Sequence, residues 1–192
     1  MAKYDIRDVF YLDSNISLGT VFDAGTQISS VIDVSSYVNP ISSGRSKGTG
    51  LAIYKVQFTW SDSSGNRPVG SSETSAFRVA LLAGYSTTQA AAAATDLATN
   101  QLSGSNDLMI AGVDYYSPSS TGADKEIPPN SGLPFMAPST EVPYVVVRDN
   151  IGMVAVDSIN TTASMKVGVR LSCAIITLDQ ATLNQLLRTQ TV

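Results

Sequence analysis

The sequence predicts an all-β protein, a sandwich or barrel of about eight strands with one or two short helices. Two long segments alternate between apolar and polar residues, which is the period of a half-buried strand. Clusters of Gly, Ser, Pro and Asn separate these segments from several shorter apolar ones. Many short strands divided by such turn residues are typical of sandwiches and barrels.

The two clearest strands are predicted at residues 51–60 and 165–175. In the first, the apolar face consists of Tyr54, Val56, Phe58 and Trp60, and the polar face of Lys55, Gln57 and Thr59. In the second, the apolar positions are Met165, Val167, Val169, Leu171, Cys173 and Ile175. We expect each strand to turn its apolar face toward the core.

Six further segments predict strands without such strict alternation, at residues 4–12, 27–34, 77–83, 108–116, 144–148 and 153–156. Asp149 and Asn150 lie between the last two segments, and both residue types tolerate the backbone angles of tight turns. We therefore expect 144–148 and 153–156 to pair as a tight hairpin.

Helix is expected in two places. Residues 87–100 include five consecutive alanines, and alanine has the highest helix propensity. Residues 179–188 begin within Thr177-Leu-Asp-Gln180, which matches a capping box, and Leu183, Leu186 and Leu187 form an apolar stripe. This second helix either closes one end of the barrel or docks as a tail on a neighbouring subunit or an underlying layer.

Three segments are predicted as loops, at residues 39–50, 61–75 and 117–143. The third contains six of the eight prolines, and it also carries Leu133, Phe135 and Met136. This composition favours an ordered, extended loop, of the kind that often lies across a neighbouring subunit. No internal repeat or linker divides the chain, so we expect a single β-barrel domain over residues 1–192.

The charge of the chain argues against direct contact with nucleic acid. The net charge is -4, and the twelve basic residues are scattered rather than clustered as a phosphate-binding surface requires. Charged residues make up only 15% of the chain, which is easier to explain if neighbouring molecules cover much of its surface. Asp is favoured over Glu, as expected of a loop-rich β protein, although this bias also fits adaptation to salt.

We recognise no secretory signal and no membrane-spanning segment in the sequence. Its start lacks an apolar h-region, and no apolar run approaches the length of a membrane span. We therefore expect synthesis and folding in the cytoplasm. Cys173 is the single cysteine, so it forms no intramolecular disulfide, and its place in an alternating segment predicts a buried, inert thiol.

The composition also excludes most catalytic chemistry. The chain has no histidine, which removes the Ser-His-Asp triad, the Cys-His pair and the usual His-based zinc sites. The segment Gly44-Arg-Ser46-Lys-Gly48 matches the pattern of a nucleophile elbow, but a loop precedes it and a strand follows it, whereas an elbow joins a strand to a helix. Ser46 and Lys47 are adjacent, and adjacent residues rarely face each other in an extended loop. Glu73, Glu126 and Glu141 lie in predicted loops with no sign of convergence. We expect no enzyme activity, no catalytic residue, no cofactor and no small-molecule substrate.

Other patterns are weak. Asp13, Asn15 and Ser17 alternate as at the start of a calcium loop, but Leu18 stands where that loop requires glycine, so no metal site is predicted beyond an incidental cation. Asn15 and Asn160 begin glycosylation sequons that we interpret as chance matches. The aromatic residues of segment 51–60 could line a sugar platform, but their spacing favours core packing.

These features together resemble a known family. The size, the histidine-free β-rich body, the long strand at 165–175 and the closing segment from Ile176 to Arg188 resemble the single jelly-roll major capsid proteins of icosahedral double-stranded DNA viruses with an internal membrane. More narrowly, the chain is similar to the smaller of the two major capsid proteins of the halophilic archaeal sphaerolipovirus group. The resemblance covers essentially the whole chain, and the modest acidity departs from a typical halophilic protein.

The resemblance implies a single jelly-roll barrel in the virion, standing upright on the capsid surface. It implies assembly with itself and with a second, larger major capsid protein into capsomers over an internal membrane, with contact to that membrane or its proteins. The alternative is a receptor- or carbohydrate-binding β-sandwich module of a viral spike or surface appendage. Exposed aromatic residues at loop tips and glycan binding by the isolated protein would favour this alternative.

Overall fold

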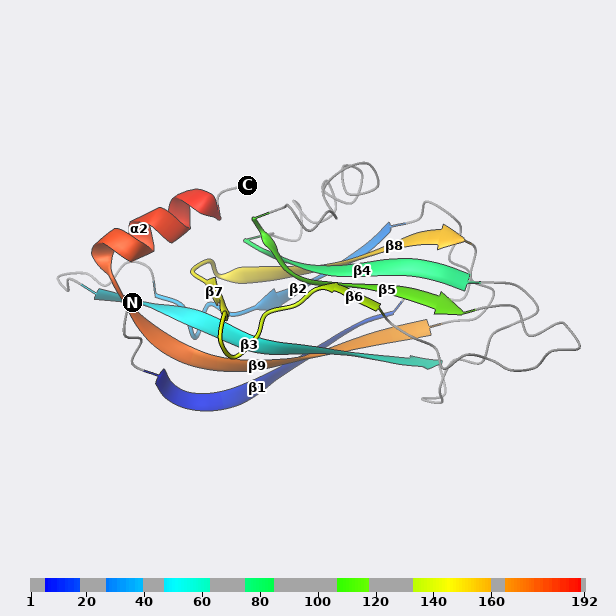
Figure 1. Ribbon diagram of the computed structural model, residues 1–192, viewed down its shortest axis with the longest axis horizontal. Helices are drawn as coiled ribbons and strands as arrows, with labels where there is room; N and C mark the ends of the chain where they lie inside the picture. The colour runs from blue at the N-terminus through cyan, green and yellow to red at the C-terminus, as the bar shows by residue number, and fades with distance from the viewer. Residues whose placement is uncertain are drawn as a thin grey trace, which may run out of the picture.

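The computed structural model describes residues 6–17, 27–39, 47–62, 75–84, 107–117, 133–159 and 165–190. These residues form two antiparallel sheets of four and five strands (Figure 1). The β1 sheet has the order β1 (Ile6–Ser17), β9 (Met165–Asp179), β3 (Lys47–Asp62) and β7 (Tyr144–Val146). The β2 sheet has the order β2 (Gln27–Asp33), β8 (Asn150–Ile159), β4 (Ser75–Ala83), β5 (Met109–Ser117) and β6 (Leu133–Met136). The prediction of an all-β protein is confirmed.

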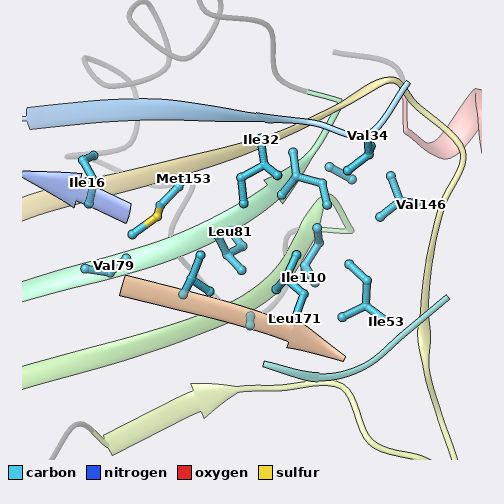
Figure 2. Close-up of a cluster of buried hydrophobic side chains, with 14 of the residues drawn as sticks. Ile16, Ile32, Val34, Ile53, Val79, Leu81, Ile110, Val146, Met153 and Leu171 are labelled. Carbon is cyan, nitrogen blue, oxygen red and sulfur yellow. The ribbon is translucent and has the colours of Figure 1, made fainter. Parts of the chain in front are cut away.

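The two sheets share one hydrophobic core (Figure 2). Ile53 and Leu171 enter it from the β1 sheet, and Val79, Leu81 and Met153 enter it from the β2 sheet. All five side chains are completely buried. Burial of one such side chain contributes about 1.5–3 kcal/mol, so contacts between the layers hold the two sheets together.

β3 differs from its prediction in length and in the face of one aromatic residue. It begins at Lys47, so residues 47–50 are strand and not part of a loop. A β-bulge lies between Ile53 and Lys55, where Tyr54 is the extra residue opposite β9. Because one extra residue reverses the alternation, Phe58 packs against the shared core, whereas Tyr54 packs against a separate cluster near the C-terminal helix. The prediction that Tyr54 and Phe58 share a face is therefore wrong.

β9 confirms its predicted alternation and then becomes buried on both sides. Val167, Val169, Leu171 and Cys173 lie in the shared core. Ile176 is also buried, but it belongs to the cluster near the C-terminal helix. Contacts on both faces explain why the apolar character of this strand continues past residue 173.

The predicted hairpin between residues 144–148 and 153–156 is wrong. β7 pairs with β3 in the β1 sheet, whereas β8 pairs with β2 and β4 in the β2 sheet. Asp149 therefore lies where the chain crosses from one sheet to the other, and its carbonyl accepts a hydrogen bond from Val34 N at 2.8 Å. A tight turn and a crossing between layers use the same residue types, so local sequence did not distinguish them.

β4 is apolar on both faces, which explains the continuous run predicted at residues 77–83. Val79 and Leu81 face the shared core, and Ala80 and Leu82 belong to a second buried cluster with Met109 and Val154. Both sets are completely buried. A strand buried on both sides reads as an unbroken apolar segment rather than as an alternation.

Most of the other strand predictions fall on residues that the structure describes. β2, β4, β5 and β8 confirm the strands predicted at 27–34, 77–83, 108–116 and 153–156, and β1 extends the strand predicted at 4–12 to Ser17. β3 runs on to Asp62 and β6 lies within the third predicted loop. The helix predicted at 87–100 lies outside the described residues. No helix in the described ranges is long and apolar enough to cross a membrane.

The C-terminal helix α2 (Gln180–Thr189) confirms the second helix prediction and packs on its own domain. Leu183 is completely buried against Ala52, Val147 and Leu178. This docking favours the interpretation that the helix covers one end of the fold over that of a tail that docks on a neighbouring subunit or an underlying layer (Figure 1). The capping prediction needs a correction: the N-cap is Asp179, whose carboxylate accepts a hydrogen bond from Thr182 N at 2.7 Å, and not Thr177.

Hydrogen bonds also tie the end of α2 to the crossing between the sheets. The Gln190 side chain accepts from Val147 N at 3.1 Å and donates to Val145 O at 2.6 Å. Arg148 Nε donates to Gln190 O at 3.0 Å, and its Nη2 donates to Leu187 O at 3.3 Å. The guanidinium thus binds carbonyl groups that the end of a helix leaves without partners, where positive charge is also favourable.

Asp179→Ala is expected to lower the thermal unfolding midpoint at neutral pH. Hydrogen bonds from the Thr182 backbone hold the pKa of Asp179 below its usual value of 3.8. A lowered pKa stabilises the fold above pH 3.8 and the contribution is lost as pH falls through the folded-state pKa. The difference between wild type and variant should therefore shrink below pH 3.8 in thermal melts followed by circular dichroism.

Asp179→Ser is the matched control, because a serine hydroxyl also caps a helix but does not titrate in this range. It should remain close to the wild type at neutral pH. A pH-independent loss for Asp179→Ala would contradict the role of the carboxylate as the cap.

Candidate functional site

The residues weighed for catalysis do not form a site in the described part of the chain. Ser46, Glu73 and Glu126 lie outside the described residues, as does the sequon residue Asn160. Lys47 is the first residue of β3, and Glu141 is exposed on a turn before β7. Within the described ranges, no group of three or more His, Cys, Asp or Glu residues could hold a metal ion.

The oxygen ligands suggested by the partial calcium pattern lie along β1. Asp13, Asn15 and Ser17 are all exposed. Asp13 accepts two hydrogen bonds from Arg170 on β9, at 2.7 Å from Nε and 3.1 Å from Nη2. This pairing holds the pKa of Asp13 below its usual value. The Asp13 carboxylate is thus engaged by a cation of the protein itself.

The aromatic residues of β3 belong mainly to the interior. The Phe58 and Trp60 rings stack with centroids 6.2 Å apart, and Trp60 lies 5.0 Å from the Tyr115 ring of β5. Tyr115 is almost completely buried. These contacts join the two sheets, so Phe58 and Trp60 are core residues and not a platform for a sugar.

Cys173 confirms the prediction of a buried thiol. Its side chain is completely buried in the shared core, and burial raises the pKa of the thiol to about 12. The thiolate is the reactive form of cysteine, so Cys173 is unreactive at neutral pH.

The most distinctive surface of the described residues is on β1, the edge strand of the β1 sheet. Val9 is 66% exposed and Tyr11 is 64% exposed, and both point outward from the sheet. The guanidinium carbon of Arg170 lies 5.7 Å from the centre of the Tyr11 ring. Because Arg170 also binds Asp13, these residues form one connected surface, which we call the β1 patch (Val9, Tyr11, Asp13 and Arg170).

The outer face beside the β1 patch is polar. Lys55, Gln57 and Thr59 of β3 and Lys166 of β9 are exposed there. Gly168 leaves room for the Thr59 side chain on this face, since a Cβ atom at residue 168 would lie 2.5 Å from Thr59 Oγ1. The exposed side chains next to the β1 patch on this face are therefore polar.

A second exposed apolar residue lies beside the opposite edge of the same sheet. Val142, two residues before β7, is 74% exposed. Ser139 holds it in a turn, because Ser139 N donates to Val142 O and Val142 N donates to Ser139 Oγ, both at 3.1 Å. Pro138 and Pro143 flank this turn. We call residues 139–142 the Val142 turn.

Sequence reasoning missed both surfaces, although one signal was available. Val9, Phe10 and Tyr11 are three consecutive apolar residues, and in a strand two of them must share a face. Phe10 packs with the shared core, where its ring stacks on Tyr37 with centroids 4.8 Å apart. Val9 and Tyr11 therefore had to lie outside. The exposure of Val142 had no comparable signal.

The sequence matches no model of a known protein family and no curated protein sequence.

Proposed function

We propose that this chain is a structural subunit of an icosahedral viral capsid and that its domain is a single jelly roll. The nested order of the strand pairs carries the proposal. The exposed apolar residues at the edges of the β1 sheet and the resemblance to the smaller sphaerolipovirus capsid protein add support.

The strand pairs are nested along the chain. β1 pairs with β9, β2 with β8, β3 with β7 and β4 with β5. A long antiparallel ribbon folded between β4 and β5 gives this nesting, and rolling the ribbon adds the pairs β3–β9 and β4–β8. This pairing supports the proposal of a jelly roll, an architecture found in viral capsid proteins and in lectins. β6 adds a short strand at the edge beside β5.

The edges of the β1 sheet favour a protein that is covered by neighbours. β1 has 12 residues and contains no proline or lysine, whereas β7 at the other edge has three residues. Short edge strands resist pairing with other chains, but a long edge with exposed apolar side chains promotes association. In a shell, a neighbouring subunit covers such an edge and symmetry repeats the contact.

The proposed partners are further copies of this chain and a second, larger major capsid protein. Together they form capsomers above an internal viral membrane, with contact to that membrane or its proteins. The chain is made in the host cytoplasm and ends in the virion. The scattered basic residues favour no direct contact with the genome.

Light scattering of the purified chain, over a range of protein concentrations and from low to molar salt, tests self-assembly. We expect discrete oligomers, capsomers or larger shells, whose size depends on salt, and electron microscopy should show their form. A mass that stays monomeric under every condition contradicts self-assembly. A glycan array on that monomer then tests the carbohydrate-binding alternative, since lectins share the jelly-roll architecture.

A further inference from the structure

We infer that the Val142 turn of one copy docks on the β1 patch of the next copy, so that subunits associate head to tail. This inference rests on the proposed assembly and names the surfaces that carry it. It starts from the distribution of exposed apolar side chains in the described residues.

The large exposed hydrophobic residues of the described ranges lie at opposite edges of one sheet. Val9 and Tyr11 are on β1, and Val142 lies two residues before β7. The sheet order β1-β9-β3-β7 puts β9 and β3 between them. A single copy therefore cannot bring Val142 onto Tyr11, whereas two copies placed side by side can.

The two surfaces are complementary in charge. Glu141 is exposed next to Val142 on the turn, and it supplies a carboxylate. On the β1 patch, Arg170 binds Asp13 through Nε and Nη2, and its side chain is 56% exposed, so a second carboxylate can approach the guanidinium. Lys166, also exposed on β9, adds positive charge to the same outer face. An apolar contact flanked by a carboxylate and a guanidinium fits this arrangement.

Each surface is fixed before contact. The two hydrogen bonds with Ser139 hold the turn, and Arg170 on β9 contacts both Tyr11 and Asp13 on the neighbouring strand β1. Little conformational entropy is then lost on association, and an aromatic residue beside arginine is typical of the residues that dominate binding energy. The contact is small, so its strength in an assembly comes from repetition.

The arrangement favours a heterologous contact over a twofold one. Pairing β1 with β1 of a second copy would leave both Val142 turns exposed. A contact between unlike surfaces uses all of them and continues from copy to copy, closing into a ring when the rotation allows. A ring is the form that a capsomer requires.

Cross-linking of mixed single-cysteine variants tests this geometry. Thr140→Cys lies on the turn and Asn15→Cys lies beside the β1 patch, and neither replaces a contact residue. The native Cys173 is buried, so it should not react with a short bis-maleimide. Under conditions in which the wild type forms oligomers, we expect cross-links between the two variants in the mixture and few in either variant alone. Gln57→Cys, exposed on β3 between the two edges, is the control and should cross-link with neither.

Val142→Asp in the Thr140→Cys background is the second arm. Val142 is largely exposed, so this change should leave the fold intact, with loss of the mixed cross-link and a shift of the oligomer toward smaller mass. Cross-links of Asn15→Cys with itself alone indicate β1–β1 pairing and overturn the inference. Absence of the mixed cross-link while the wild type still forms oligomers overturns the contact and leaves the capsid proposal standing. A wild type that stays monomeric overturns both.

Discussion

Leu81→Ala is expected to destabilise the domain by about 2–5 kcal/mol, the range measured when a large core side chain is truncated to alanine. Leu81 is completely buried near the end of β4, and it lies in the shared core with residues of the opposite sheet (Figure 2). β4 lies between β8 and β5, so the backbone has little freedom to collapse into the space that the side chain leaves. The loss should therefore include the cost of a cavity as well as the lost burial.

Urea unfolding followed by tryptophan fluorescence measures this effect, because Trp60 packs with the same core. Gln57→Ala, exposed on β3, is the control and should change the free energy of unfolding by no more than about 0.5 kcal/mol. Equal stability of the Leu81→Ala variant and the wild type would show that the two sheets do not pack through this core.

Sequence alone predicted the all-β class and most strands because burial leaves a periodic signal. β9 shows this most clearly, since its core residues Val167, Val169 and Leu171 alternate over a regular stretch of strand. β4 was harder to predict as a strand, because burial on both faces removes the alternation. Leu82, for example, is as buried as its neighbour Leu81. Only the length of the apolar run indicated a strand there.

The failures came from features that depend on distant parts of the chain. The bulge at Tyr54 is defined by pairing with β9, more than a hundred residues away, so local sequence alone did not establish it. The crossing at Asp149 was predicted as a tight turn because both features use the same residue types. The pairing shows the difference, since β7 pairs with β3 whereas β8 pairs with β2 and β4. Local propensity describes a residue, whereas register and sheet assignment describe pairs.

The candidate surfaces also combine features that local sequence predicts with features that depend on distant residues. Val9 could be predicted as exposed once Phe10 was assigned to the core, because the two cannot share a face. The pairing of Asp13 with Arg170 could not be predicted, since the two residues are 157 positions apart in the sequence. The position of Val142 opposite β1 depends on the strand order of the whole sheet.

Gln190→Leu is expected to destabilise the domain by about 2–6 kcal/mol, because it leaves two backbone groups without their hydrogen-bond partner. The Gln190 side chain is almost completely buried and binds both Val147 N and Val145 O. Leucine is similar in size but cannot replace either bond. The loss is the desolvation cost of a buried donor and an acceptor, and each such group costs about 1–3 kcal/mol.

The same substitution separates two roles of the C-terminal segment. If α2 closes one end of the domain, its loss exposes Leu183, Leu178 and Val147, and unfolding of the helix should coincide with unfolding of the sheets. Far-ultraviolet circular dichroism and tryptophan fluorescence should then report one transition at a lower urea concentration. Gln185→Leu, exposed on the same helix, is the control and should leave that midpoint nearly unchanged.

A separate early transition of the helix in the Gln190→Leu variant would instead mean that α2 is a detachable tail. In that case the hydrogen bonds from Arg148 to Leu187 O and Gln190 O would not couple the helix to the crossing between the two sheets.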